Sequence, residues 1–118
     1  MERKHRLFQR APGFITILIG PEHVFEFVND AYAAIFGGRD FVGRRARDVF
    51  PELSERDFFS LLDRVYRTGE RYVAHHVPIE LRNRPDGRTE RHVLDFIYEP
   101  IKDSEGRVTG IFCEGHDV

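Results

Sequence analysis

Residues 14–36 read FITILIGPEHVFEFVNDAYAAIF, and this stretch decides the fold. Its first part is apolar and rich in β-branched residues, which predicts a buried strand over 14–19. After a Gly-Pro-Glu turn, residues 23–28 form a second β-prone run, which we expect to pair with the first as a hairpin. Asn29 can then cap a helix over 30–36, because its side-chain oxygen can accept hydrogen bonds from free backbone N–H groups.

The second half of the chain predicts one longer helix followed by three strands. The helix should begin at Ser54, whose hydroxyl can cap it, and should end at Gly69. Its core face should be one stripe of apolar residues, namely Phe58, Leu61, Leu62 and Val65. Strand-like stretches separated by Asp- and Gly-containing turns then follow at 71–81, 89–101 and 108–114.

This order of elements predicts the fold class. Two strands, a helical block and three more strands indicate an α+β domain, with one five-stranded antiparallel sheet and short helices packed on one face. The 118 residues suffice for one domain with one core. We expect residues 1–12 to be a lead-in segment and residues 13–118 to be the folded domain.

Charge and composition narrow the function class. The net charge of −2 gives no indication of nucleic-acid binding. No apolar run approaches the ~20 residues needed to cross a bilayer, so we expect no membrane contact by this segment. Cys113 is the only cysteine, which excludes an intrachain disulfide and fits a reducing compartment. The prediction is a cytoplasmic domain.

Five segments, in the right order, resemble the motifs of PAS domains. They are residues 17–37 with their Asn-Asp-Ala-Tyr helix start, 41–53 (FVGRRARDVFPEL), 84–87 (RPDG), 98–106 (YEPIKDSEG) and 116–118 (HDV). Each motif alone is weak, whereas five in order are specific, and the resemblance extends over nearly the whole chain. The last segment resembles the beginning of the Asp-hydrophobic-Thr motif that closes many PAS domains.

The resemblance implies a sensory, signal-transduction domain excised from a larger bacterial signalling protein. We expect that protein to be a sensor histidine kinase of a two-component system, with a nucleotide cyclase or a transcription regulator as the alternative output. Asp117, in the closing motif, is then a candidate for signal relay. Two other functions stay open, which are a ligand-free module that only dimerises or binds a partner, and a small enzyme or carrier on a similar scaffold.

The resemblance also implies where a ligand would bind, between the inner face of the sheet and the short helices. The candidate lining residues are Tyr32, Phe36, Phe41, Val49, Phe50, Phe58, Leu62, Val77, Leu94, Phe96, Ile111 and Cys113. The sequence leaves open whether these side chains surround a cavity or fill a solid core.

No residue pattern supports catalysis, a metal site, haem or a covalent flavin. His75 and His76 are neighbours on a predicted strand and should point to opposite faces, so they cannot chelate one ion together. The helix expected over 54–68 contains no His, Cys or Met to bind haem iron. Residues 37–51 contain no cysteine for a flavin adduct, and a buried Cys113 should behave as a small hydrophobe. We expect a non-catalytic domain, whose cofactor the sequence does not identify.

The first strand predicts the mode of assembly. Both of its faces are apolar, and the helices can cover only one of them. The other face needs the lead-in segment, a partner chain or both. We therefore expect a homodimer through the outer face of the sheet and the lead-in, with Leu7, Phe8, Ile15 and Ile17 as the contact candidates.

Overall fold

The computed structural model describes residues 7–54 and 57–118, so the first half of the expected lead-in lies outside the described residues. The elements in chain order are β1 (Phe14–Ile19), β2 (Val24–Val28), α2 (Asp30–Phe36), α3 (Ala46–Val49), the 3₁₀ helix η1 (Pro51–Leu53), α4 (Phe58–Thr68), β3 (Tyr72–Leu81), β4 (Glu90–Lys102) and β5 (Val108–Asp117). No helix among the described residues is long and apolar enough to span a bilayer.

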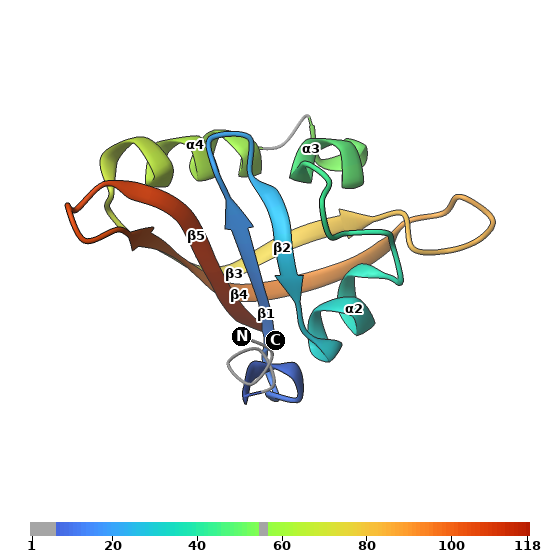
Figure 1. The fold of residues 1–118 in the computed structure, drawn as a ribbon. Coiled ribbons are helices and arrows are strands. Elements are labelled where there is room, and N and C mark those ends of the chain that lie inside the picture. The colour runs from blue at the N-terminus through green and yellow to red at the C-terminus, as the bar shows by residue number, and fades with distance from the viewer. Residues whose placement is uncertain (1–6, 55–56) are drawn as a thin grey trace.

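The strands form one antiparallel sheet in the order β2-β1-β5-β4-β3. The last strand, β5, runs between β1 and β4 and so joins the N-terminal hairpin to the β3–β4 hairpin (Figure 1). The helices α2 to α4 pack on one side of this sheet, which we call the inner face. The predicted α+β fold with a five-stranded antiparallel sheet is confirmed.

Asn29 joins the lead-in, β1 and α2. Its Oδ1 accepts hydrogen bonds from the backbone N–H of Ile15 at 2.8 Å and of Tyr32 at 2.9 Å. Its Nδ2 donates to the carbonyls of Phe8 at 3.0 Å and Gly13 at 2.9 Å. The predicted helix cap is confirmed, and the same buried amide also fixes residues 8–15 against the sheet.

The start of α4 differs from the prediction. The helix begins at Phe58 with Asp57 as its N-cap, whereas Ser54 ends η1 in a helical backbone conformation. The prediction that Ser54 caps α4 is therefore wrong, because the Pro-Glu-Leu segment before it forms a separate 3₁₀ turn that ends there. The predicted apolar stripe is largely confirmed, since Phe58, Leu62 and Val65 are buried and Leu61 is half-buried. Gly69, in the left-handed conformation, ends the helix as expected.

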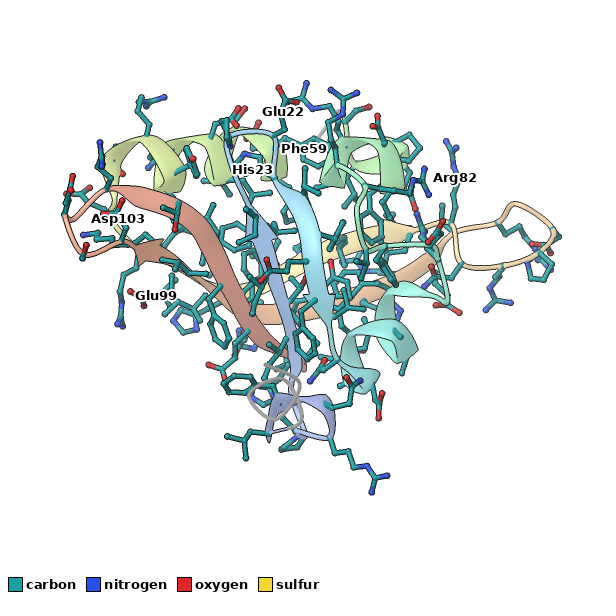
Figure 2. All side chains as sticks on the ribbon, in the orientation of Figure 1. Glu22, His23, Phe59, Arg82, Glu99 and Asp103 are labelled. Carbon is teal, nitrogen blue, oxygen red and sulfur yellow. The ribbon has the colours of Figure 1, made fainter. Side chains whose placement is uncertain are left out.

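The hairpin turn between β1 and β2 reaches α4. His23 lies in this turn and is almost completely buried beside the helix (Figure 2). Its Nε2 lies 2.7 Å from Oδ1 of Asp63, and its ring packs edge-on against Tyr66. The contact fixes α4 across the inner face, where α4 covers part of the core.

The outer face of the sheet is partly covered by the lead-in. Residues 7–9 are helical, and the Phe8 ring contacts the Phe112 ring on β5 at 5.8 Å between centroids. Ile15, on this face of β1, is only 4% exposed within one chain. Leu7 is 78% exposed, so the lead-in leaves one apolar side chain in solvent.

Candidate functional site

An apolar cavity of about 60 Å³ lies between the inner face of the sheet and the helices. Strands β1, β2, β3, β4 and β5 form its floor, and α2, α3, η1 and α4 form its roof. It is lined by Phe14, Thr16, Leu18, Phe25, Tyr32, Phe36, Ala46, Phe50, Leu53, Phe58, Phe59, Leu62, Ile79, Leu94, Phe96, Tyr98 and Cys113. None of these side chains carries a charge at neutral pH.

Aromatic rings form much of the wall. Tyr32 stacks on Phe36 with 4.2 Å between ring centroids, and Phe14 meets Phe36 edge to face at 5.3 Å. On the other side, Phe96 and Tyr98 lie 4.9 Å apart on β4. Rings in such arrangements hold each other in place, so the cavity has a defined shape.

Three polar groups of the lining have no hydrogen-bond partner among the described residues. They are the hydroxyls of Tyr32 and Tyr98 and the thiol of Cys113, whereas the hydroxyl of Thr16 donates to the carbonyl of Phe27 at 2.7 Å. Burial, reinforced by the nearby Cys113 thiol, raises the pKa of both phenols well above 10.0. Burial likewise raises the pKa of the Cys113 thiol. All three groups are therefore neutral donors at physiological pH.

Eight of the twelve predicted pocket residues line this cavity: Tyr32, Phe36, Phe50, Phe58, Leu62, Leu94, Phe96 and Cys113. Phe41, Val49 and Ile111 are buried in the surrounding core without lining it. Val77 lines a separate, more open depression with Tyr72 and Leu61. That these residues bind a ligand stays a prediction.

The sequence analysis missed other lining residues, among them Phe14, Leu18 and Tyr98. The residues of β1 alternate between the two faces, so Phe14 and Leu18 could have been found from their even spacing in that strand. Tyr98 lies on the same face of β4 as Leu94 and Phe96, which gives the same signal.

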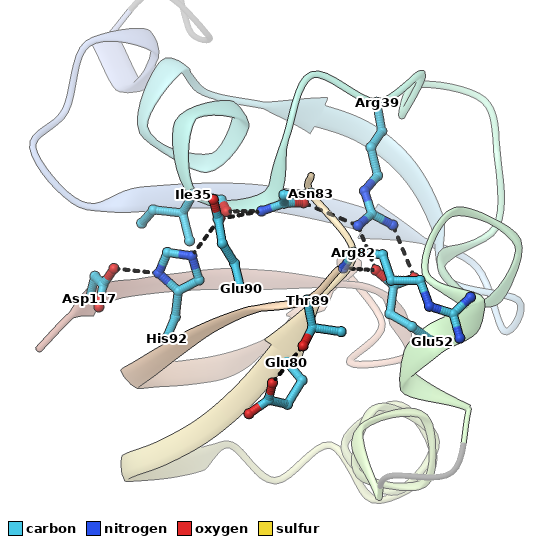
Figure 3. A network of polar contacts seen from close by, with 10 residues as sticks. All are labelled: Ile35, Arg39, Glu52, Glu80, Arg82, Asn83, Thr89, Glu90, His92 and Asp117. Carbon is cyan, nitrogen blue, oxygen red and sulfur yellow. Dashed lines mark hydrogen bonds and ion pairs between the residues drawn. The ribbon is translucent and has the colours of Figure 1, made fainter. Parts of the chain in front are cut away.

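A polar network begins at the cavity wall. The Arg39 guanidinium lies over the Phe50 ring, 4.5 Å from its centroid. It donates to both carboxylate oxygens of Glu52 (Figure 3). It also donates to the carbonyl of Val49 at 2.8 Å. The backbone N–H of Arg82 also donates to Glu52, at 2.9 Å. The ion pair joins the loop between α2 and α3 to η1, and the Arg82 hydrogen bond joins η1 to the end of β3.

The network continues to the end of β5. Arg39 donates to Oδ1 of Asn83 at 3.1 Å, and Nδ2 of Asn83 donates to Oε1 of Glu90 at 3.1 Å (Figure 3). His92 then lies between two carboxylates, with Nε2 3.1 Å from Glu90 and Nδ1 2.7 Å from Asp117. Carboxylates only accept, so both ring nitrogens must donate and the geometry fits a protonated imidazole.

The pKa values in this network follow from the balance of burial and pairing. Burial acts to raise the pKa of Glu52, but the hydrogen bonds from Arg39 and from the Arg82 backbone outweigh it and the pKa is lowered. Burial acts to lower the pKa of His92, but the hydrogen bonds to Asp117 and Glu90 outweigh it and the pKa is raised. Asp117, the relay candidate, is thus held to β4 by a charged contact.

The exposed histidines are separate from both regions. His75 and His76 lie near Asp95 with more than two-thirds of each side chain exposed, at a bulge in β3. Among the residues that the structure describes, no group of three metal-ligating side chains could hold an ion.

Comparison with known proteins places this geometry in a family. A family model for the PAS fold matches residues 8–118. The structure of VqmA bound to DPO is similar to this chain with a TM-score of 0.74 and 25% identity, and the match covers 100% of this chain and 57% of VqmA. A Vibrio cholerae VqmA dimer determined without its target DNA matches with the same score and identity, over 52% of VqmA. The chain thus spans about half the length of VqmA.

Two isolated domains share the fold at lower identity. The PAS domain of a Colwellia psychrerythraea protein matches with a TM-score of 0.72 and 12% identity, over 99% of this chain and 95% of that domain. The PAS domain of the histidine kinase ThkA matches with a TM-score of 0.67 and 16% identity, over 89% of this chain and 99% of that domain.

Proposed function

The chain belongs to the PAS family, and we propose that it is a sensory domain that binds a small ligand in its apolar cavity and regulates an output domain in a longer protein. The observation that carries this proposal is the cavity itself, which lies between the sheet and the helices and is lined by neutral, largely aromatic side chains. A molecule that fills about 60 Å³ in such a core adds packing contacts worth on the order of 1 kcal/mol, before any hydrogen bond is counted.

The polar network supports a route from the cavity to the end of the domain. Phe50 lines the cavity on one side and supports the Arg39 guanidinium on the other. A ligand that shifts the Phe50 ring changes the position of Arg39, and through Asn83 and Glu90 it changes the support of His92. The proposed result is a shift in the population of conformers at Asp117, the candidate residue for signal relay.

The identity of the output domain belongs to the same proposal. We favour a histidine kinase, because the PAS domain of ThkA has this fold. The alternative is a DNA-binding regulator, which the similarity to VqmA favours. The sequence of the parent protein distinguishes them, since a kinase would contain a phosphorylated histidine and an ATP-binding domain.

We also propose that the domain dimerises through its outer sheet face. Leu7 and Val73 are exposed apolar side chains, and Ile17 on this face of β1 is half-buried. Ile15 has little surface left to contribute, because the same chain already covers it.

In sedimentation, Leu7→Asp should weaken a dimer at micromolar concentration. Val42→Asp is the control, because Val42 is 60% exposed in the loop between α2 and α3. A wild-type chain that sediments as a monomer at high micromolar concentration contradicts the dimer.

Native mass spectrometry of the purified domain tests ligand binding. We expect a species heavier than the chain, and we expect Leu62→Phe to reduce it because the larger ring occupies the cavity. Leu61→Phe is the matched control, since Leu61 lies on the same helix outside the cavity. If the bare chain mass is found and no small molecule raises the melting temperature, the cavity has no ligand-binding role.

A further inference from the structure

The cavity contains donor groups whose hydrogens have no acceptor among the described residues. The hydroxyls of Tyr32 and Tyr98 and the thiol of Cys113 each carry one hydrogen, and none of them donates to another described residue. These residues are at most 8% exposed. A ligand with an acceptor could therefore form hydrogen bonds with donors that no described residue uses.

The three groups lie close to one another. All three residues line the same cavity. Tyr32 comes from α2, Tyr98 from β4 and Cys113 from β5. The strand register pairs Tyr98 directly with Cys113, and Tyr32 adds a third donor to the lining of the same cavity from α2.

The cavity disfavours a charged ligand. No lining side chain carries a charge that could replace the hydration shell of an ion. Arg39 is the cation that acts to lower the pKa of Tyr32, and its guanidinium already pairs with Glu52. An anion or a cation would therefore lose its hydration without compensation.

The size of the cavity limits the ligand further. One water-sized group needs roughly 10–15 Å³ of such volume, so about 60 Å³ accommodates roughly four to six non-hydrogen atoms. Haem and flavin are several times larger, and the present arrangement of side chains has no room for either.

We propose that the ligand is a small neutral molecule with an apolar body and one hydrogen-bond acceptor, such as a carbonyl or ether oxygen, which is directed at Tyr32, Tyr98 and Cys113. This inference rests on the proposed function, because it names the chemical class of ligand for the same cavity.

The experiment compares three probes of equal ring size, each titrated into the refolded domain with methyl NMR as the readout. Cyclopentanone has the acceptor, methylenecyclopentane has the same shape without it, and cyclopentylammonium is charged. We expect shifts at the methyl groups of Leu18, Leu62 and Leu94, which line the cavity. We expect the ketone to bind about threefold to tenfold more tightly than the alkene, and the ammonium ion to bind more weakly than both.

Variants test whether the hydroxyls of Tyr32 and Tyr98 cause the preference for the ketone over the alkene. In the double variant Tyr32→Phe/Tyr98→Phe, the preference for the ketone should fall to about twofold or less. Tyr66→Phe should leave it unchanged, since Tyr66 packs on His23 outside the cavity. Because the change removes only unpartnered hydroxyls, the double variant should keep its fold, which its NMR spectrum checks.

The possible outcomes separate the two proposals. Equal binding of ketone and alkene, or a preference that survives in the double variant, overturns the acceptor class but leaves the cavity as a ligand site. If the ammonium ion binds as tightly as the ketone, the inference that the ligand is neutral is wrong. If none of the three probes shifts the lining methyl groups at millimolar concentration, both this inference and the cavity-based function are wrong.

Discussion

The apolar cavity and the polar network at the end of the same sheet differ in how their polar atoms are used. In the network, Arg39 donates to Glu52, Val49 and Asn83, and both nitrogens of His92 face a carboxylate. In the cavity, two phenols and a thiol have no partner among the described residues. In the network, the hydrogen-bonding groups are paired within the protein. In the cavity, donor groups are available to a ligand.

This difference assigns each region a role in the proposed mechanism. A satisfied charged network has few alternative arrangements, and so it can transmit a displacement from one end to the other. A cavity with unused donors gains free energy from whatever molecule supplies an acceptor. Phe50 belongs to both regions, since it lines the cavity and lies under Arg39. The following predictions test the contrast by changing one region at a time.

The largest effect is expected from Arg39→Ala. Glu52 is only 5% exposed in its side chain, so removing its partner leaves a nearly buried carboxylate unpaired. We expect a loss of about 3 kcal/mol in the free energy of unfolding, measured by urea denaturation. Arg45→Ala is the control, because its pairs with Asp48 and Glu22 are exposed and should contribute below about 1 kcal/mol. Equal losses in the two variants would show that the network does not stabilise the domain.

The next largest effect is expected from Leu62→Ala in the cavity wall. Leu62 is 4% exposed, and its truncation enlarges the cavity, so we expect a loss of about 2.5 kcal/mol. Leu61→Ala, on the half-buried side of the same helix, should cost about 1 kcal/mol or less. Urea denaturation of both variants measures the difference. A loss below about 1 kcal/mol for Leu62→Ala would mean that α4 does not support the cavity.

A smaller, pH-dependent effect is expected from His92→Gln. The pKa of His92 is raised in the folded protein, so its charged contacts contribute fully below the unfolded value of about 6.5 and are lost as the pH rises through the raised folded value. Glu90 and Asp117 face the ring, and Arg84 lies near Glu90. We expect the free energy of unfolding of wild type to exceed that of the variant by about 1 kcal/mol near pH 6. In alkaline solution the two values should converge.

Two measurements check the His92 prediction. Denaturation of wild type and variant over a pH series from about 5 upward measures how the difference in their free energies of unfolding changes as the His92 imidazole titrates. An NMR titration of the His92 ring should give a pKa above its ordinary 6.5. A difference that grows with pH, or a ring pKa below 6.5, contradicts the assignment.

The smallest effect is expected from Tyr98→Phe. Its hydroxyl has no partner among the described residues, so its removal breaks no hydrogen bond within that part of the chain and should change the free energy of unfolding by less than about 0.5 kcal/mol. Thr16→Val is the informative contrast, because it removes the hydroxyl that donates to Phe27 and should cost about 1 kcal/mol. A large loss in Tyr98→Phe would show that this hydroxyl stabilises the fold and is not available to a ligand.

The β1–β2–α2 segment shows what can be predicted from sequence. Its run of apolar, β-branched residues, its turn and Asn29 are local signals, and the structure places β1 and α2 at the expected residues. The start of α4 was predicted wrongly, because a second short helix with its own preferences precedes it. In β3, the bulge between Ala74 and Val77 depends on Asp95, whose carboxylate accepts from the His76 backbone on the neighbouring strand.

The sequence by itself determined the fold, the order of elements and the family resemblance, because hydrophobic periodicity and capping act over a few residues. Only the tertiary structure decided that Phe41, Val49 and Ile111 lie outside the cavity while Tyr98 lines it. It alone also brought Asn83 to the carbonyl of Ile35 and to Arg39, which are more than forty residues away in the chain. Such contacts depend on strand register and on how the helices pack across the sheet, and no local pattern encodes either one.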